Sequence, residues 1–379
     1  MLFFNIFEAS KRILKIKTIK VLQLIDSLDA GGGERMAVHL ANALSEEVEL
    51  SALICTRHSG ILEADVSSKV KFKCLHKKHS LDFNALLRLR NFVKKHHINI
   101  IHAHSTSFFM ATLLKLSMPK IKLIWHDHYG FRYQTGLKKN IPLYICSFFF
   151  NHIIAVNEKL KLWSESTLNC KKVDYIQNFS LKNKNKDSKN SLILKGDKNA
   201  YKIIHVANLR PQKDHLTALK AIQEIIKKSY DVSYHMIGAY DDNSEYYKSI
   251  ISFIKQKKIE KNVFIYGSQT NIAGLLKQAN MGLLSSVSEG LPVSLIEYAQ
   301  AKLPVIVTDV GQCKSVVGIY AKVITPKDYK ALTDAIITNI NHPEKAKQNS
   351  IFLNKKISKE FDPNLIIKKI KSIYLSVLN

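Results

Sequence analysis

Two glutamates, Glu289 and Glu297, stand on either side of a proline in residues 285–297. A strand is expected to end at Ser285, and proline at the first position of a helix loses no hydrogen bond, so Pro292 predicts a helix that contains Glu297 while Glu289 lies in the loop before it. At about 1.5 Å per residue, the steps from Pro292 to Glu297 cover about 7–8 Å. Carboxylates at this spacing can hold hydroxyl groups on different parts of one ligand, and the N–H groups at the helix start can bind an anion. Sugar and ribose hydroxyls with a diphosphate match this arrangement; a capping carboxylate at Glu289 and a surface charge at Glu297 are the alternatives.

A basic loop follows another predicted strand, in residues 203–215. The apolar run ends at Ala207 and a helix begins near His215, which places Arg210 and Lys213 in the loop between them. Arginine offers a planar fork to phosphate oxygens and lysine offers a point charge. The two cations could therefore offset the charge that builds on a departing diphosphate. The alternative is a loop whose charges are only solvated.

Three consecutive glycines, Gly31, Gly32 and Gly33, follow the first predicted strand and precede a helix that starts near Glu34. Glycine allows a ligand to approach the backbone closely, and the start of a helix favours anions. The G-x-G-x-x-G spacing is absent, so a dinucleotide cofactor is poorly supported. A glycine run by itself is weak evidence for a phosphate site.

Histidines gather at the ends of two successive predicted strands, with His102 and His104 on one and His126 and His128 on the next. Two H-x-H pairs are a loose pattern that could bind a metal ion, contact a substrate or pack at the strand ends. No D-x-D stands at a strand end. We therefore expect that neither a metal ion nor another cofactor is needed.

Strand and helix patterns alternate almost throughout the chain, which predicts an α/β protein with parallel sheets covered on both faces. Strands are predicted at residues 19–25, 50–56, 70–74, 98–102, 122–126, 152–156, 202–207, 233–237, 263–266, 281–285 and 304–308. Helices are predicted near residues 81–96, 215–229, 246–257, 272–280 and 292–301.

Residues 182–200 are dense in Lys, Asn, Asp and Ser, a composition that predicts a linker. We therefore expect a Rossmann-like, doubly wound N-terminal domain over residues 1–181 and a second one over 201–362. A basic amphipathic helix over 363–379 could pack back on the N-terminal domain. Because ligands of open parallel sheets bind at the carboxyl ends of the strands, we expect the site where those ends of the two sheets face each other.

The composition excludes several classes of protein. Of 379 residues, 46% are hydrophobic and 23% are charged, which suits two buried cores. The 5 cysteines contain no C-x-x-C pair, which argues against a disulfide framework and a zinc site. The longest apolar stretch, residues 141–156, is interpreted as a buried helix that runs into a strand and not as a membrane span. Because residues 1–20 do not resemble a signal peptide, we expect the protein in the cytoplasm.

The charge is strongly basic, with 57 Lys and Arg against 31 Asp and Glu, a net charge of +26. Such an excess favours partners that carry phosphate. The lysines are spread along the chain, so a lysine-rich composition without function is the alternative. We expect no nucleic-acid partner, because no nucleic-acid-binding module is present. The basic N-terminal segment and the Lys-rich first domain are candidates for contact with anionic lipid.

The segment around Glu289 and Glu297 resembles the E-x7-E signature of retaining glycosyltransferases of the GT-B fold, in family 4. Its continuation through Glu297-Tyr298-Ala299 and residues 303–311 follows the same pattern. The resemblance implies two Rossmann-like domains over roughly residues 18–375. It also implies that Glu289 contacts hydroxyls of the donor sugar, and that Glu297 contacts the ribose.

Further site residues follow from the same resemblance. The backbone amides after Gly290, in the loop with Leu291 and Pro292, would take the donor phosphates, which Gly31, Gly32 and Gly33 would also border. Lys213 would bind the diphosphate, and His126 would face the reacting sugar. The chain departs from the family where Lys302 replaces a frequent glycine, where Gln312 and Ser315 replace a glycine and a glutamate, and where Asn208 replaces a frequent arginine. Arg210 is the candidate substitute for that arginine.

The resemblance predicts transfer of a sugar from a nucleotide-diphosphate sugar, with retention of configuration and without metal, to a hydroxyl of a lipid-linked or growing glycan. UDP is favoured by its frequency in the family. A nucleotide-sugar epimerase on the same fold and a basic polyanion-binding protein are the alternatives. An epimerase would convert the nucleotide-sugar without an acceptor, and a polyanion binder would show strong salt dependence.

Overall fold

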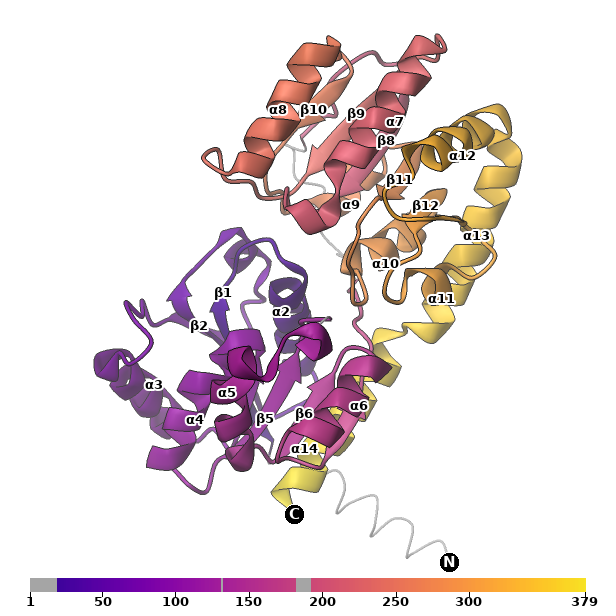
Figure 1. Ribbon diagram of the computed structural model, residues 1–379. Coiled ribbons are helices and arrows are strands. Elements are labelled where there is room, and N and C mark those ends of the chain that lie inside the picture. The colour runs from indigo at the N-terminus through magenta and orange to yellow at the C-terminus, as the bar shows by residue number, and fades with distance from the viewer. Residues whose placement is uncertain (1–18, 131, 182–191) are drawn as a thin grey trace, which may run out of the picture. The chain divides into compact units, whose positions relative to one another are not determined.

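The computed structural model describes residues 19–130, 132–181 and 192–379. The chain divides into two compact units: the first comprises the described residues up to Asn178 together with Pro363–Asn379, and the second is Phe179–Asp362 (Figure 1). Two regions used in the sequence predictions lie outside the described residues: the basic N-terminal segment to residue 18, and residues 182–191 of the predicted linker.

The first unit is built on a seven-stranded sheet in the order β3-β2-β1-β4-β5-β6-β7, with every neighbouring pair parallel. Its strands are β1 Lys20–Ser27, β2 Leu50–His58, β3 Lys71–Cys74, β4 Ile100–His104, β5 Lys122–Asp127, β6 His152–Ala155 and β7 Val173–Tyr175. The order reverses beside β1, between β1 and β4. Their carboxyl ends form the edge at which a doubly wound sheet binds ligands.

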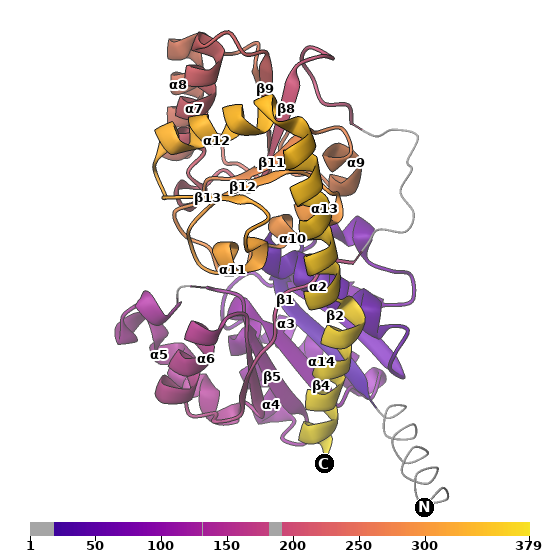
Figure 2. The same cartoon turned by 90° about the vertical axis from the view of Figure 1, so that its right-hand side faces the viewer.

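The helices of the first unit are α2 Gly32–Leu44, α3 Phe83–Lys95, α4 Phe108–Ser117, α5 Leu137–Cys146, α6 Glu158–Thr167 and α14 Pro363–Leu378, with short 3₁₀ turns η1 Ile61–Asp65, η2 Ser105–Ser107, η3 Arg132–Gln134 and η4 Ser147–Phe149. Helices α3 and α4 share a core with Leu22, Leu24 and Trp125 of the sheet. Helix α14 packs beside α2 on the opposite face, behind the sheet in Figure 1 and in front of it in Figure 2. The chain thus returns to the first unit at its C-terminal end.

The second unit has a six-stranded parallel sheet in the order β10-β9-β8-β11-β12-β13. Its strands are β8 Tyr201–Val206, β9 Val232–Ile237, β10 Val263–Ile265, β11 Met281–Leu284, β12 Val305–Thr308 and β13 Lys322–Ile324. One face carries α7 His215–Lys227, α8 Glu245–Lys257 and α12 Tyr329–Asn341, and the other carries α9 Ile272–Leu276, α10 Val293–Gln300, α11 Cys313–Val317 and α13 Pro343–Glu360. The 3₁₀ turn η5 Pro211–Lys213 leads into α7.

Both sheets therefore confirm the predicted fold class, two doubly wound parallel α/β units. The described part of the predicted linker packs on the second unit, where the Leu194 and Lys195 amides donate to Gln278 and Tyr266 at 3.0 and 2.7 Å.

Helix α10, which carries Glu297, is fixed to the sheet by one buried tyrosine. The Tyr298 hydroxyl accepts from the Val206 amide at 2.6 Å and donates to the Leu283 carbonyl at 3.2 Å. A Cβ at Gly282 would lie 2.6 Å from the Tyr298 ring, so β11 needs glycine at this position. Pro292 was predicted to be the first helical residue of α10, but it is the N-cap, one position before the helix. Lys302 follows the helix with φ +56°, the left-handed conformation for which glycine is suited.

The prediction of a buried helix within residues 141–156 is wrong in one respect. Helix α5 runs into η4 and then into β6, but its apolar residues divide between two faces. Leu143 and Cys146 are buried, whereas Ile141, Tyr144, Ile145 and Phe148 are 50%, 40%, 55% and 64% exposed. The four exposed side chains recur at helical spacing and form one solvent-facing stripe. Among the described helices, none combines the length and the hydropathy needed to cross a bilayer.

Candidate functional site

In the second unit, the structure brings two of the predicted site residues into direct contact. The Lys213 ammonium lies 2.7 and 2.8 Å from the two carboxylate oxygens of Glu289. Glu289 is 6% exposed at its side chain and Lys213 is 23% exposed. Lys213 ends η5 after β8, and Glu289 lies in the loop after β11, so both stand at carboxyl ends of adjacent strands. Because an ammonium has three donors and a carboxylate about four acceptor positions, each group retains capacity for a ligand.

The loop of Glu289 is held in place from several sides. The Ser286 hydroxyl donates to Glu289 Oε1 at 2.6 Å, and the Thr308 hydroxyl donates to the Ser286 carbonyl at 2.6 Å. Gly311 has φ +55°, and a Cβ there would lie 2.1 Å from the Glu289 carbonyl oxygen. Glycine is therefore required at residue 311, because this backbone approaches the Glu289 loop without room for a side chain.

Lys213 is also positioned by its backbone. Asp214 adopts the left-handed conformation with φ +48° and caps α7, where its carboxylate accepts from the Thr217 hydroxyl at 2.7 Å. The Ser285 hydroxyl donates to the Asp214 carbonyl at 2.9 Å, and the Val287 amide donates to the Gln212 carbonyl at 2.9 Å. The loops after β8 and β11 are thus joined by hydrogen bonds on both sides of Lys213.

Arg210 differs from Lys213 in its surroundings. Its side chain is exposed, and within the described residues no ion pair or hydrogen bond holds its guanidinium. The Asn208 amide oxygen accepts from the Ala239 amide at 2.9 Å, so Asn208 ties two loops together. Arg210 is thus the free cation of this loop, and its role in binding a diphosphate stays a prediction.

The remaining donor-side residues follow in the chain. The Gly290 carbonyl accepts from the Gln312 amide at 3.0 Å, Leu291 is buried, and α10 starts after Pro292. Glu297 lies on α10 and is half-buried. The roles predicted for these residues and for Glu297 stay predictions.

In the first unit, the three glycines lie at the start of α2, but the helix begins at Gly32, two residues before the predicted start near Glu34. Gly31 is the N-cap and, as a glycine, offers no side chain to cap the helix. A Cβ at Gly33 would lie 3.3 Å from the His128 ring, so the glycine loop packs directly against a histidine. Nearby, Asp26 at the end of β1 is half-buried. Its partial burial raises its pKa, but the Thr106 and Thr56 hydroxyls at 2.5 Å and the charges of Lys77 and Arg57 hold the pKa below its usual value.

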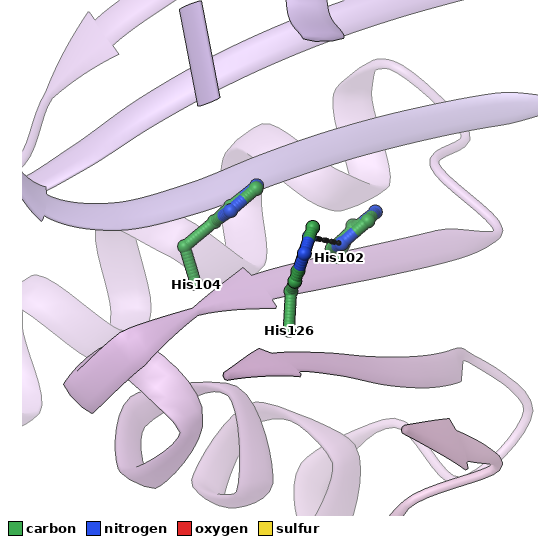
Figure 3. Close-up of side chains that lie close together, drawn as sticks. All are labelled: His102, His104 and His126. Carbon is green, nitrogen blue, oxygen red and sulfur yellow. Dashed lines mark hydrogen bonds between the residues drawn. The ribbon is translucent and has the colours of Figure 1, made fainter. Parts of the chain in front are cut away.

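The four histidines form one cluster at the ends of β4 and β5. His102 Nε2 lies 3.2 Å from His126 Nδ1, and His104 Nδ1 lies 2.9 Å from His128 Nε2. Figure 3 shows His102, His104 and His126 projecting from adjacent strands, with the bond between His102 and His126 drawn. His102, His104 and His126 could hold a metal ion, because one nitrogen of each lies within 4.8 Å of the others.

Burial keeps these histidines neutral. It lowers the pKa of His102 and of His128 to about 3, and it lowers the pKa of His104 and His126 well below the usual value, with neighbouring histidines adding to the effect. The cluster therefore consists of donors and acceptors of hydrogen bonds and carries no charge at neutral pH.

Acidification below about pH 6.5 is expected to destabilise the first unit. The unfolded histidines take up protons at that pH whereas the folded ones do not, so the stability they contribute is lost progressively from about pH 6.5 towards pH 3. For His102 and His128, with pKa values of about 3, the loss at pH 5 is about 2 kcal/mol each. Denaturant unfolding at pH 7 and pH 5 measures it, and equal stability at both values would contradict neutral burial.

Several residues of these sites escaped the sequence predictions. Gln23 and Tyr374 are hydrogen-bonded to the histidine cluster, although they are 351 positions apart. A glutamine inside the apolar run of the first strand was a usable signal, because a buried polar residue needs a partner. Asp127 was also missed: Arg132 binds its carboxylate at 2.8 and 3.2 Å, although burial still raises the pKa of Asp127. This pair fixes the start of the loop after β5.

Family models match both units. Residues 30–179 match the model of Glycosyltransferase Family 4, and residues 183–351 match that of Glycosyl transferases group 1. The chain is 25% identical over 378 residues to a capsular polysaccharide biosynthesis glycosyltransferase, CapH, of Staphylococcus aureus, with 94% of this chain and 99% of the relative covered. It is 22% identical to a UDP-Gal:alpha-D-GlcNAc-diphosphoundecaprenol alpha-1,3-galactosyltransferase of Escherichia coli, with 79% and 80% covered.

Solved structures show the same fold at lower identity. HepE of Anabaena in complex with UDP and glucose has a TM-score of 0.79 at 16% identity, covering 94% of this chain and 100% of HepE. TarM has a TM-score of 0.73 at 13% identity, covering 95% of this chain and 99% of TarM. With two doubly wound units and a glycosyltransferase model matching each of them, the chain is a glycosyltransferase of the GT-B fold.

Proposed function

We propose that the chain transfers a sugar, with retention of configuration and without a metal ion, from a nucleotide-diphosphate sugar to a hydroxyl of a lipid-linked or growing bacterial surface glycan. UDP-sugar is the favoured donor. The observation that carries the proposal is the Lys213–Glu289 pair at the carboxyl ends of β8 and β11, which offers a cation and a carboxylate side by side. Two relatives support this kind of acceptor: one is named for capsular polysaccharide biosynthesis, and the other for transfer to a diphosphoundecaprenol-linked sugar.

In this proposal the second unit binds the donor. Lys213 and Arg210 neutralise the diphosphate as it leaves, which supplies the charge that a metal ion provides in other enzymes. Glu289 accepts hydrogen bonds from the sugar hydroxyls, Glu297 from the ribose, and the backbone from Gly290 to Pro292 lies beside the phosphates. UDP in complexes of HepE, a protein of the same fold, supports a uridine nucleotide. His126 of the first unit contacts a sugar hydroxyl.

The exposed stripe that α5 and the following turn η4 share supports a membrane-bound acceptor. We therefore propose that the enzyme acts at the inner face of the cell membrane. Its apolar side chains Ile141, Tyr144, Ile145 and Phe148 suit insertion into the boundary of the lipid headgroups, and the net charge of +26 suits anionic lipid.

A double variant of this stripe, Ile145→Glu with Phe148→Glu, is expected to reduce co-sedimentation with anionic vesicles at low salt, because two charges oppose burial of the stripe. Leu162→Glu, an exposed leucine on α6, is the control. Equal binding by the wild type and the double variant would exclude this surface.

The transfer itself is tested with purified protein, UDP-sugars and a lipid-linked diphosphate acceptor, with and without EDTA. We expect acceptor-dependent product whose new linkage keeps the donor configuration by NMR, and equal rates with EDTA. Conversion of the donor without acceptor would instead favour the epimerase. Strongly salt-dependent binding of polyanions without any turnover would favour the binding protein.

A further inference from the structure

A continuous chain of hydrogen bonds crosses the α14 face of the first sheet. Its members come from β1, β4, β5, α14 and the loop after β5, and we call them the histidine relay: His128, His104, Gln23, Tyr374, His102 and His126. The distances between bonded atoms, in order along the relay, are 2.9 Å for His128–His104, 2.9 Å for His104–Gln23, 3.3 Å for Gln23–Tyr374, 2.7 Å for Tyr374–His102 and 3.2 Å for His102–His126. Gln23, His102, His104, His126 and Tyr374 are fully buried. The relay is therefore shielded from solvent over most of its length.

Gln23 gives one arm of the relay a direction. Its amide oxygen can only accept, so the His104 Nε2 atom that contacts it must carry a proton. A neutral imidazole has one protonated nitrogen, which leaves His104 Nδ1 as an acceptor for the N–H of His128 Nε2. His128 Nδ1 is then a bare lone pair.

The other arm follows from the amide nitrogen of Gln23, which can only donate. It donates to the Tyr374 oxygen, and the Tyr374 O–H is then given to His102 Nδ1. His102 Nε2 therefore carries a proton, which it donates to His126 Nδ1. His126 must hold its own proton on Nε2.

The two ends of the relay are the atoms that the protein leaves unused. His126 Nε2 and His128 Nδ1 are buried, and among the residues that the structure describes neither atom has a hydrogen-bond partner. Their rings are close, with centroids 4.1 Å apart. His126 Nε2 therefore offers an N–H to a ligand, and His128 Nδ1 offers a lone pair. A hydroxyl both donates and accepts, so a sugar hydroxyl can satisfy both ends, whereas a phosphate would meet a lone pair at His128.

We propose that Gln23 and Tyr374 are positioning residues that fix His126 with its proton on Nε2, and that the paired ends of the relay bind a sugar hydroxyl. The inference rests on the proposed function for the identity of this ligand. Helix α14 thereby has a direct role in the site of the first unit. The Tyr374 O–H fixes which nitrogen of His102 is protonated, and His102 in turn fixes the protonation of His126.

A metal ion on His102, His104 and His126 is the competing use of the same atoms. It would require bare nitrogens on all three rings, facing one point. In the relay both nitrogens of His102 and both of His104 already make hydrogen bonds. A metal ion would therefore have to break the relay.

The test uses two variants of the full chain and a readout independent of activity. Tyr374→Phe removes the O–H that His102 accepts. Gln23→Glu replaces the amide donor with an acceptor, which draws the Tyr374 O–H away and moves the His126 proton to Nδ1. In histidine-labelled protein, ¹⁵N NMR distinguishes protonated from bare ring nitrogens. We expect His126 with a proton on Nε2 in the wild type and with altered protonation in both variants.

In turnover assays, we expect kcat to fall about tenfold in each variant, the effect of one lost hydrogen bond in the transition state. The control Ile370→Val trims a buried side chain of the same helix, and it should lower stability without changing kcat or the protonation of His126. Unchanged protonation and kcat in both folded variants would overturn the inference, as would stoichiometric zinc in the purified wild type. An inactive wild type with the expected NMR pattern would contradict only the proposed function.

Discussion

Glu289→Ala is expected to abolish sugar transfer while the protein stays folded. Its carboxylate is buried, bonded to Lys213 and Ser286, and held by a loop that Gly311 closely approaches. Loss of one pre-positioned group that contacts the reacting sugar lowers kcat by about 10²–10³ or more. Steady-state kinetics on a lipid-linked acceptor, with circular dichroism as the check on folding, measures the effect.

The matched control is Glu245→Ala, which removes an exposed glutamate paired with Lys248 on α8. Exposed ion pairs contribute little, so neither stability nor kcat should change. Ser286→Ala should fall between the two, because it removes one hydrogen bond from the Glu289 carboxylate and leaves the carboxylate in place. Near-normal turnover by Glu289→Ala would show that this carboxylate does not contact the sugar.

Lys213→Met is expected to reduce both stability and turnover. It leaves Glu289, whose side chain is 6% exposed, without its cation. Removing one partner of a buried ion pair lowers the free energy of unfolding by about 3–5 kcal/mol. Because Lys213 is partly exposed, we expect a loss of about 2–3 kcal/mol for this variant. The variant also loses a cation beside the departing diphosphate, so kcat should fall by at least about 10².

The double variant Lys213→Met with Glu289→Gln separates the two effects. Glutamine removes the unpaired charge, so the double variant should regain most of the stability that Lys213→Met loses. Its turnover should stay as low as that of either single variant. Thermal unfolding and single-turnover assays on the three proteins give the comparison. A double variant that is no more stable than Lys213→Met would contradict the pairing of these residues.

Much of the fold follows from local pattern. The buried strands of both sheets are apolar runs bounded by polar turns, so strands such as β1, β2 and β9 were predicted within a few residues. Helix α14 begins where predicted because Pro363 marks its start, and it ends at Leu378, one residue before the predicted end. The edge strands β7 and β13 were missed because each is three residues long and includes a charged residue, Asp174 or Lys322, whereas the equally short edge strand β10 is wholly apolar and was predicted.

The site was harder to predict where it depends on long-range contacts. Glu289 and Lys213 were found because each stands in a loop next to a strand end, but their direct contact depends on the pairing of β8 with β11. The bonds from Gln23 to Tyr374 and from Tyr374 to His102 join opposite ends of the chain. A local sequence pattern cannot predict that a C-terminal helix packs on the first sheet. The exposed face of α5 was misread for a similar reason, because hydropathy shows an apolar stripe but not what covers it.

The central claim, a nucleotide-diphosphate site built on Glu289, Glu297 and Lys213, is tested most directly by thermal stabilisation. The purified protein is heated with UDP, GDP, ADP or CMP, and with their sugars, in the absence of metal. We predict that one diphosphate, UDP in the favoured case, stabilises the fold by about 2.7 kcal/mol at a hundredfold excess over Kd, and that Glu297→Ala weakens the effect. A folded sample that responds to no nucleotide, or equally to all of them, would contradict the claim.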